Sequence, residues 1–508
     1  MILNQGEIYP VKRKVLVGGT LAVVLLGAAY VGSSWMAGRS VQDTLEKQNQ
    51  WLSSLPYFIV KNREYHRGWF SSTEKTTLQI NPQLYRFFLE KEGEPLPTFE
   101  VTYTQNIQHG PLPLLSHFNP HPYKAVVTTD FQFSPETQKT LSRFFGTQKP
   151  ISIENRISFN DDGLMTIKVP SFDYEEAISG VKAKWQGLNA TLDYGGDFNR
   201  VKLIATAPGL SGEAKGKGQF MATDMTFESD HVRGKTGLMI GTSSAKIADF
   251  TLDMPGDNPF KLGLHNLSYD GKLAENGELI DGSAHFMLEK LVLNDQPYGP
   301  AELLAEANHL HGPTLAKLGD EFNRLQKQQL TREQLSSELM KLAKAEGMPL
   351  LTHDPRLAIR KLDIKLPDSS IHFSGEVGLQ GFKPEDLDQP AVFMRKLVAK
   401  ADFNVPRKVI STVVTWQARN MFGNADNGVS QADLDYLAGQ FVEGQLDRMS
   451  EQKLIRVDGD TISATASLEG GKFILNGANV PLPWEQVQHA VAGAATEAEK
   501  PAKVEASK

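Results

Sequence analysis

The 508-residue chain contains no cysteine. This absence excludes disulfide cross-links, thiolate metal sites and cysteine nucleophiles, but it does not assign a redox compartment. The chain also lacks a basic excess, since 53 Lys and Arg residues stand against 60 Asp and Glu residues and the net charge is −7. A general nucleic-acid-binding protein carries a basic face, so we expect no nucleic-acid partner.

The familiar catalytic motifs are absent from the sequence. No HExxH, GxSxG, GxGxxG or complete P-loop occurs. Two histidine pairs, His117 with His121 and His309 with His311, have spacings that could supply two imidazoles to a metal. Neighbouring prolines and a glycine make both segments loop-like, and no carboxylate stands at an obvious ligand spacing. We therefore predict no catalytic residue, no metal site and no cofactor.

One long apolar run lies near the N-terminus, at Val15–Gly38, which holds 24 residues without a charge. As a helix it would span about 36 Å, enough for a hydrocarbon core of about 30 Å. A signal peptide has a shorter apolar region, of about 7–15 residues, so we favour an uncleaved anchor over cleavage after Gly27–Ala29. Lys12, Arg13 and Lys14 precede the run, which predicts residues 1–14 in the cytoplasm and the body outside it. No later segment approaches this length, so one span over 15–38 is expected.

After the run, alternating apolar and polar residues dominate the chain. Ile151, Ile153, Ile157 and Phe159 share one face of such a segment, and turn residues punctuate many others. This pattern is typical of antiparallel strands with one buried and one wet face. We predict a mainly β (α+β) fold: a large antiparallel, twisted sheet or a sandwich. Its β-rich regions are expected over 40–310 and 351–487, as one sheet or as two domains.

Two helical insertions interrupt the predicted strands. One is a helical pair over about 313–346, within the segment 311–350, where Thr331 and Gln334 form a capping box. The other lies near 406–450. Its apolar stripes are predicted to be core faces lying on the sheet, with partner grooves as the alternative; they comprise Val409, Val413, Trp416, Leu434, Leu437 and Phe441. A final hairpin turns at Gly470-Gly471, and residues 488–508 are expected to be disordered.

Two local motifs are more specific than these patterns. The first joins two predicted strands and comprises Tyr65, His66, Arg67, Gly68, Trp69, Phe70, Ser71 and Ser72. The second, His109-Gly110-Pro111-Leu112-Pro113-Leu114, ends another strand, and its prolines cannot donate to a sheet ladder. We interpret both motifs as structural. In particular, we expect the His109 ring to hydrogen-bond the backbone, with a switch or ligand role as the alternative.

An anchor, then YHRGWFSS at 65–72, HGPLPL at 109–114 and GGKFILNG at 470–477 occur in this order. This order resembles the YdgA/YihF family of Gram-negative envelope proteins, a family without an assigned activity. The resemblance spans roughly residues 15–485. It implies an inner-membrane protein whose body lies in the periplasm and which can self-associate. It supplies no catalytic residues. The longer cytoplasmic start and the charged C-terminal tail depart from the family pattern.

These observations favour a non-enzymatic, single-pass membrane protein of the cell envelope that acts by interaction or envelope maintenance. Its partners would be the membrane, a second copy of the chain, or an envelope protein or lipid. The alternative is a lipid- or amphiphile-binding protein that uses an apolar groove on its sheet. A periplasmic hydrolase, whose residues converge only in the fold, is a lesser alternative.

Overall fold

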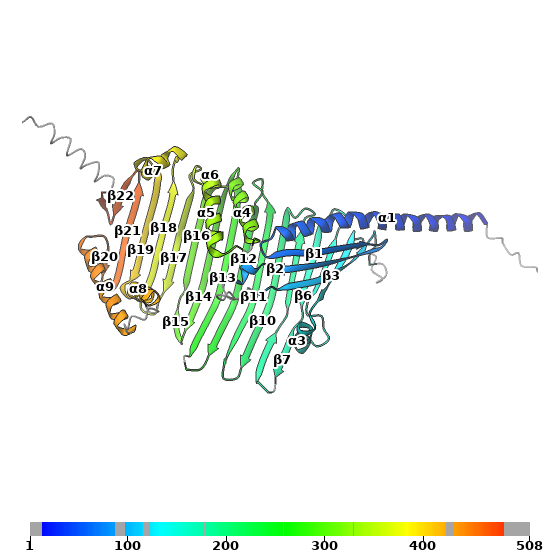
Figure 1. Cartoon of the computed structure of the whole chain (residues 1–508), viewed down its shortest axis with the longest axis horizontal. Coiled ribbons are helices and arrows are strands. Elements are labelled where there is room, and N and C mark those ends of the chain that lie inside the picture. Colours follow the sequence, from blue (N-terminus) through cyan, green and yellow to red (C-terminus); the bar gives the residue numbers. More distant parts are fainter. Residues whose placement is uncertain are drawn as a thin grey trace, which may run out of the picture. The chain divides into compact units, whose positions relative to one another are not determined.

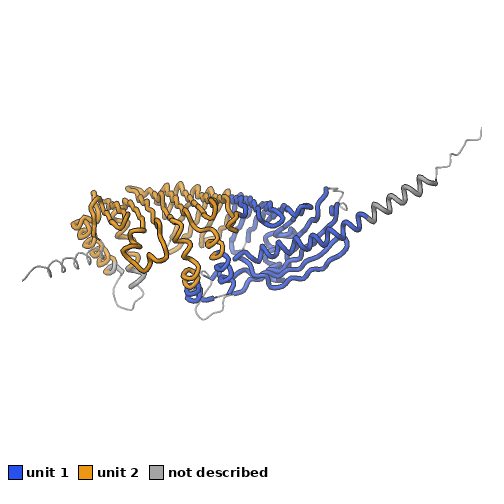
Figure 2. The backbone as a smooth tube through the Cα atoms, turned by 90° about the horizontal axis from the view of Figure 1, so that it is seen from above, with its two compact units in different colours: residues 1–210, 226–233, 319–338 blue, residues 211–225, 234–318, 339–508 orange. Residues whose placement is uncertain are grey.

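A computed structural model describes residues 13–86, 97–114, 121–176, 178–257, 259–328, 330–422 and 431–481. Its 23 strands belong to one antiparallel sheet, which several helices accompany (Figure 1). The predicted antiparallel, mainly β fold is therefore confirmed. The sandwich alternative is wrong for the described residues, because their strands form a single sheet. The chain divides into unit 1 (residues 1–210, 226–233 and 319–338) and unit 2 (residues 211–225, 234–318 and 339–508), coloured separately in Figure 2.

In unit 1, the strands pair in the order β1-β2-β3-β4-β5-β6-β9-β10, each antiparallel to its neighbour. Strands β7 and β8 form a hairpin, and β8 also pairs with β10. The bounds are β1 Phe58–Arg67, β2 Ser71–Ile80, β3 Glu100–His109, β4 Ala125–Gln132, β5 Ser152–Ile157, β6 Gly163–Val169, β7 Phe172–Glu176, β8 Val181–Trp185, β9 Leu188–Tyr194, β10 Arg200–Ala214 and β11 Gly218–Arg233. The last two strands have residues in both units. The helices are α1 Arg13–Ser54, η1 Pro82–Leu84 and α3 Pro135–Phe145.

Helix α1 packs against the sheet of unit 1 (Figure 1). Val41 and Leu45 lie on one helix face and contact a buried cluster that includes Ile107, Val127 and Ile157. The sheet residues alternate with polar neighbours, so each strand turns its apolar side toward the helix. Burial of these aliphatic side chains holds the second half of α1 to the sheet.

Within the described part of the chain, no helix has both the length and the apolar character needed to cross a membrane. The structure therefore does not support the span predicted over 15–38, which stays a prediction from the sequence. Residues 1–12 of the predicted cytoplasmic segment and the predicted disordered tail at 488–508 lie outside the described residues.

Unit 2 is a meander in the order β12-β13-β14-β16-β17-β18-β19-β21-β22-β23. Two short strands, β15 and β20, pair with β14 and β21. The bounds are β12 Met239–Met254, β13 Phe260–Asn276, β14 Leu279–Leu293, β15 Gln296–Tyr298, β16 Ala301–His311, β17 Arg356–Lys365, β18 Ser370–Leu379, β19 Leu397–Pro406, β20 Arg456–Asp458, β21 Thr461–Glu469, β22 Lys472–Leu475 and β23 Ala478–Val480. The predicted final hairpin is confirmed: Gly470 and Gly471 have φ values of 60° and 80°, which suit a tight primed turn.

The predicted helical regions are also confirmed. Helices α4 Gly312–Gln326 and α5 Arg332–Glu346 form the first, and each has residues in both units. The Gln334 amide donates to Thr331 Oγ1 at 3.2 Å and the Thr331 amide donates to Gln334 Oε1 at 2.9 Å, as a capping box requires. Helices α8 Arg407–Phe422 and α9 Gln431–Glu451 form the second. The remaining short helices of unit 2 are α6 Met348–Leu351, η3 Pro384–Asp388 and α7 Pro390–Lys396.

The predicted core faces of α8 and α9 are wrong at four positions, whereas Val409 of the same prediction is partly buried. Trp416, Leu437 and Phe441 are 61%, 59% and 62% exposed, and Val413 is half exposed. The core instead receives a neighbouring stripe, which comprises Ile410, Val414, Val442 and Leu446. Each helix has two apolar stripes, and periodicity alone does not tell which one faces the sheet. The side chain of Leu434 lies outside the described residues.

Candidate functional site

A groove with a volume of about 590 Å³ lies in unit 2, over strands β16 to β19, β21 and β22. Most of its lining is apolar. The lining residues are Ala305, Glu306, Leu357, Ala358, Ile359, Phe373, Gly375, Glu376, Val377, Ala399, Lys400, Ala401, Ala466, Ser467, Leu468 and Phe473.

Strand register explains why this part of the sheet is hollow. Ile359 is paired with Gly375, Gly375 with Ala401, and Ala401 with Ala466. Residues paired in this way project from the same face of a sheet, so small side chains form a row across neighbouring strands. We call the row of Gly375, Ala401 and Ala466 the groove floor. A larger residue has little room at Gly375. A Cβ added there would lie 3.1 Å from the Phe373 ring and 3.2 Å from the Lys400 carbonyl oxygen.

Larger side chains stand on both sides of the floor. Leu357 pairs with Val377 on one side, and that row continues through the small residue Ala399 to Leu468 and Phe473. Phe373 pairs with Phe403 on the other side. Leu357 and Val377 are 51% and 44% exposed, so the groove presents apolar surface to solvent. Exposed apolar surface that forms a contiguous concavity marks an interaction or ligand site.

The opposite face of the same strands is charged. Arg360 donates to Glu306 and to Glu376, at 2.8 Å each, and Lys361 donates to Glu302 at 2.7 Å. The hydrogen bond from Arg360 holds the pKa of Glu376 below its usual value. One face of the sheet therefore carries charged side chains that water can hydrate, whereas the groove face presents few hydrogen-bonding side chains.

Helices α8 and α9 bound the groove at one end. Ile410, Val414, Val442 and Leu446 contact Phe403 and Ala464 there. Ala464 lies two residues before Ala466 of the floor, so both project from the same face. The helices cover this end, beside β19 and β21 in Figure 1, and leave the floor accessible.

The two sequence motifs lie in unit 1 against α1. His109 is buried, with Nε2 3.1 Å from Ser72 Oγ and Nδ1 3.0 Å from the Ser34 carbonyl oxygen. Burial lowers the pKa of His109. The helix approaches the ring closely, because a Cβ added at Gly38 would lie 2.5 Å from His109 Cε1. The ring thus connects strand β3 to the backbone of α1.

Arg67 and Phe70 of the first motif contact the same part of the helix. The Arg67 guanidinium lies over the Trp35 ring, 5.6 Å from its centroid, and Phe70 stacks on Tyr30 with centroids 6.1 Å apart. The backbone explains both motif glycines. A Cβ at Gly68 would lie 2.5 Å from the Ser71 carbonyl oxygen, and Gly110 has φ of 133° beside Ser34.

The remaining motif residues have varied surroundings. Tyr65 packs against the α1 core cluster, and Pro111 is partly exposed. His66 is exposed, as is Ser71. The structural role predicted for both motifs stays a prediction, although their contacts with α1 show which element they would position.

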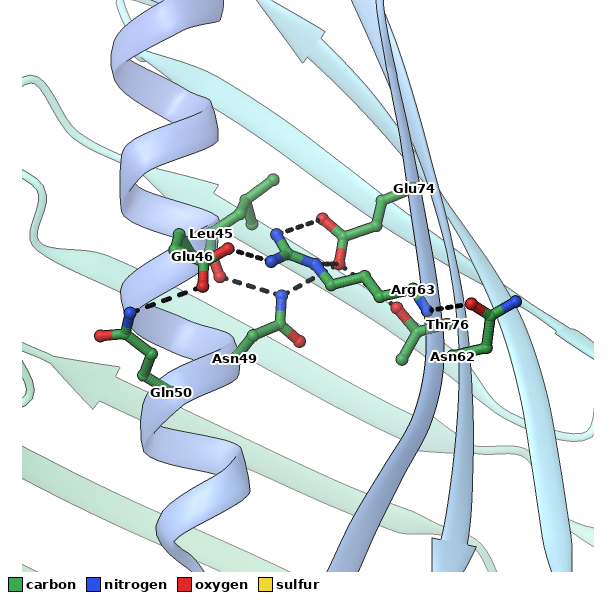
Figure 3. A network of polar contacts seen from close by, with 8 residues as sticks. All are labelled: Leu45, Glu46, Asn49, Gln50, Asn62, Arg63, Glu74 and Thr76. Atoms are coloured by element: carbon green, nitrogen blue, oxygen red, sulfur yellow. Dashed lines mark hydrogen bonds and ion pairs between the residues drawn. The ribbon is translucent and has the colours of Figure 1, made fainter.

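Sequence reasoning missed a buried polar network beside the motifs (Figure 3). The Arg63 guanidinium donates to both carboxylate oxygens of Glu74, at 2.6 and 3.0 Å, and also to Glu46 of α1. Asn49 Nδ2 donates to Glu74 at 2.9 Å. Burial opposes the charge of Arg63, but these hydrogen bonds outweigh it and raise the pKa of Arg63. The one signal in the sequence was a run of polar residues on the helix-facing side of β2.

Two further buried polar groups connect α1 to the sheet. Lys124 donates to Thr44 at 3.0 Å and pairs with Asp161. Tyr194 donates to Asn155 at 2.9 Å and accepts from Gln48, and burial raises its pKa. These contacts join successive turns of α1 to the sheet, so this part of the helix is fixed at more than one point.

The residues around the two motifs and the histidine pairs give little support for catalysis or metal binding. Ser72 and His109 have the spacing of a nucleophile and its base, but both are buried, so a substrate could not reach the hydroxyl. Among the described residues, no three metal-ligating side chains converge. His311 contacts Thr314 and stacks on His353, whereas His117 lies outside the described residues.

Comparison with known proteins confirms the resemblance seen in the motifs. A family model described as "Bacterial protein of unknown function (DUF945)" matches residues 13–483. The chain is also similar to the protein YdgA of Escherichia coli strain K12, with 22% identity over 486 residues. The alignment covers 91% of this chain and 93% of the Escherichia coli protein.

Proposed function

For this chain, a member of the DUF945 family of bacterial proteins of unknown function, we propose a role as a membrane-anchored, amphiphile-binding protein of the cell envelope. The role is non-enzymatic and serves envelope maintenance. The observation that supports it is the apolar groove of unit 2, with its floor of small residues and its exposed walls.

The size of the groove suits an extended apolar ligand. Its volume of about 590 Å³ lies within the usual range of ligand sites, about 300–1,000 Å³. The groove crosses six adjacent strands, whose spacing of about 4.8 Å gives it a length of about 24 Å. Each methylene group buried along it would contribute about 0.8 kcal/mol. A linear acyl chain is therefore the chemical class that the groove fits best.

The anchor supplies access to such ligands. Val15–Gly38 is long and uncharged enough to span a bilayer, with basic residues before it. In this proposal the N-terminus is cytoplasmic, the span lies in the bacterial inner membrane, and the sheet regions of both units lie in the periplasm. The protein would then meet amphiphiles where they leave or enter the membrane.

In-cell photocrosslinking tests the proposal. A photoreactive phenylalanine analogue replaces Leu357 on the groove wall, and the matched control replaces Ile474, a similarly exposed aliphatic residue whose partner Ser467 alternates with the floor residue Ala466. After irradiation, mass spectrometry of the full chain should show a lipid adduct at position 357 and none at 474. A protein adduct at 357, or no adduct at either position, would overturn the proposal.

A protein-interaction role is the second candidate, and a different observation favours it. Helices α8 and α9 expose a surface of large apolar residues: Val413, Trp416, Tyr436, Leu437 and Phe441. Surfaces of this composition often bind other proteins, including a second copy of the same chain. The same photoreactive residue at Phe441 tests this role. A cross-linked protein there, with no lipid at Leu357, would favour it over amphiphile binding.

A further inference from the structure

Unit 1 contains a separate apolar cavity of about 370 Å³, between the C-terminal part of α1 and the sheet. Trp51 and Leu52 of the helix line it, facing Phe131, Ile153 and Met165 of the strands. The three strand residues are only partly buried, so space remains between helix and sheet. The first half of the helix–sheet interface is filled by aliphatic side chains, whereas this second part is not.

Aromatic rings make one wall of the cavity rigid. Trp51 stacks on Phe198, with centroids 4.8 Å apart and an interplanar angle of 13°. Phe198 in turn stacks on Tyr194 at 4.7 Å, and Tyr194 is fixed by its hydrogen bonds to Asn155 and Gln48. A wall held in this way keeps its shape when the cavity is empty, which favours a preformed ligand site.

The two polar side chains that α1 contributes to the cavity already have partners in the protein. Gln48 donates to Tyr194 and Asn49 donates to Glu74, so both amides hold α1 in place. None of the described residues that line the cavity is Lys or Arg. The lining thus offers no cation to a phosphate or carboxylate, and it selects the apolar tail of an amphiphile rather than its headgroup.

We propose that this cavity binds one acyl chain of a phospholipid drawn from the bilayer that holds the anchor. Helix α1 runs without interruption from Arg13 to Ser54, and Trp51 lies 13 residues beyond Gly38, the end of the predicted span. At 1.5 Å per residue the cavity lies about 20 Å from that end along the helix. The bilayer is therefore the nearest source of acyl chains. This site shares the anchor with the proposed function but does not depend on the groove of unit 2.

Fluorescence quenching of Trp51 tests this site in the full chain, reconstituted in nanodiscs of phosphatidylcholine brominated at mid-chain. The chain has six tryptophans, so the signal of Trp51 is the difference between the native protein and Trp51→Phe. We expect Trp51 to be quenched in brominated nanodiscs relative to unbrominated ones. Quenching should be lost in Ile153→Phe, because the larger ring fills the cavity, and Met165→Phe provides a second filling variant if the first does not fold.

Ala401→Phe is the matched control, since it adds a ring to the groove floor of unit 2 and should leave the quenching of Trp51 unchanged. An unquenched Trp51 would overturn the inference, as would quenching that persists in folded Ile153→Phe and Met165→Phe. If Trp51 is quenched while Leu357 captures no lipid, the cavity stands and the groove proposal fails. If Leu357 captures lipid while Trp51 is not quenched, the groove proposal is supported and the cavity proposal is refuted.

Discussion

Substitutions of the buried ion pair Arg63–Glu74 should destabilise unit 1 by different amounts, depending on which partner is removed. Glu74 has no exposed surface, whereas the Arg63 side chain is 21% exposed and retains Glu46 as a second partner. Removal of one partner of a buried ion pair costs about 3–5 kcal/mol, because the other charge stays buried without compensation. Arg63→Met leaves the fully buried carboxylate without its cation. Glu74→Met leaves a guanidinium that still contacts Glu46 and water.

We therefore expect Arg63→Met to destabilise unit 1 by about 4–5 kcal/mol and Glu74→Met by about 3 kcal/mol. The double variant should be less destabilised than either single variant, since a buried ion pair can be exchanged for apolar side chains at little cost. Asn49 would lose its bond to Glu74, but it would keep its 3.0 Å bond to the Leu45 carbonyl oxygen.

Hydrogen exchange of the amides in α1 and β2 is the suitable assay, because a chain with two compact units need not unfold in one step. Amides of β17 to β19 in unit 2 provide an internal control and should be unaffected. A destabilisation of less than about 1 kcal/mol by Arg63→Met, as for a surface pair, would refute this prediction. The prediction also fails if the double variant loses as much stability as both single variants together.

Three further predictions concern other contacts. Ala401→Phe should abolish lipid capture at Leu357 while the circular dichroism spectrum stays native, because the added ring occupies the groove floor; capture at native levels would refute this. Gly38→Ala should lower the thermal midpoint, with a cost of about 1–3 kcal/mol, since its Cβ would overlap the His109 ring; an unchanged midpoint would refute the close approach. Burial lowers the pKa of His109, so the unfolded chain takes up the proton first as pH falls below about 6.5. Stability should decline from there toward pH 5, and His109→Gln should remove that part of the decline in thermal melts; an identical decline would exclude His109.

Alternation and turn residues made much of the fold predictable. The antiparallel sheet, the hairpin at Gly470-Gly471 and the helices at 313–346 follow local rules that act within a few residues. The choice of which apolar stripe of α8 and α9 is exposed does not follow such local rules. Val413 and Val414 are both apolar, and only the tertiary contacts of Val414 with the core decide which of them is buried.

The groove and the polar network were not predictable for a different reason. Gly375, Ala401 and Ala466 come from three strands, and their common row depends on the register between segments far apart in sequence. Arg63 and Glu74 are polar residues on a buried side, where the hydrophobic pattern anticipates apolar ones. Their partner in α1 is not identifiable before the helix is placed.

The groove floor also bears on how related proteins could diverge. Its depth arises from missing side-chain atoms at a few positions rather than from a special backbone. A single change at Ala401 or Ala466 could shorten or narrow the groove while the strand ladder stays intact. Selection on the ligand and selection on folding would then act on different residues, and members of one family could handle amphiphiles of different length on the same scaffold.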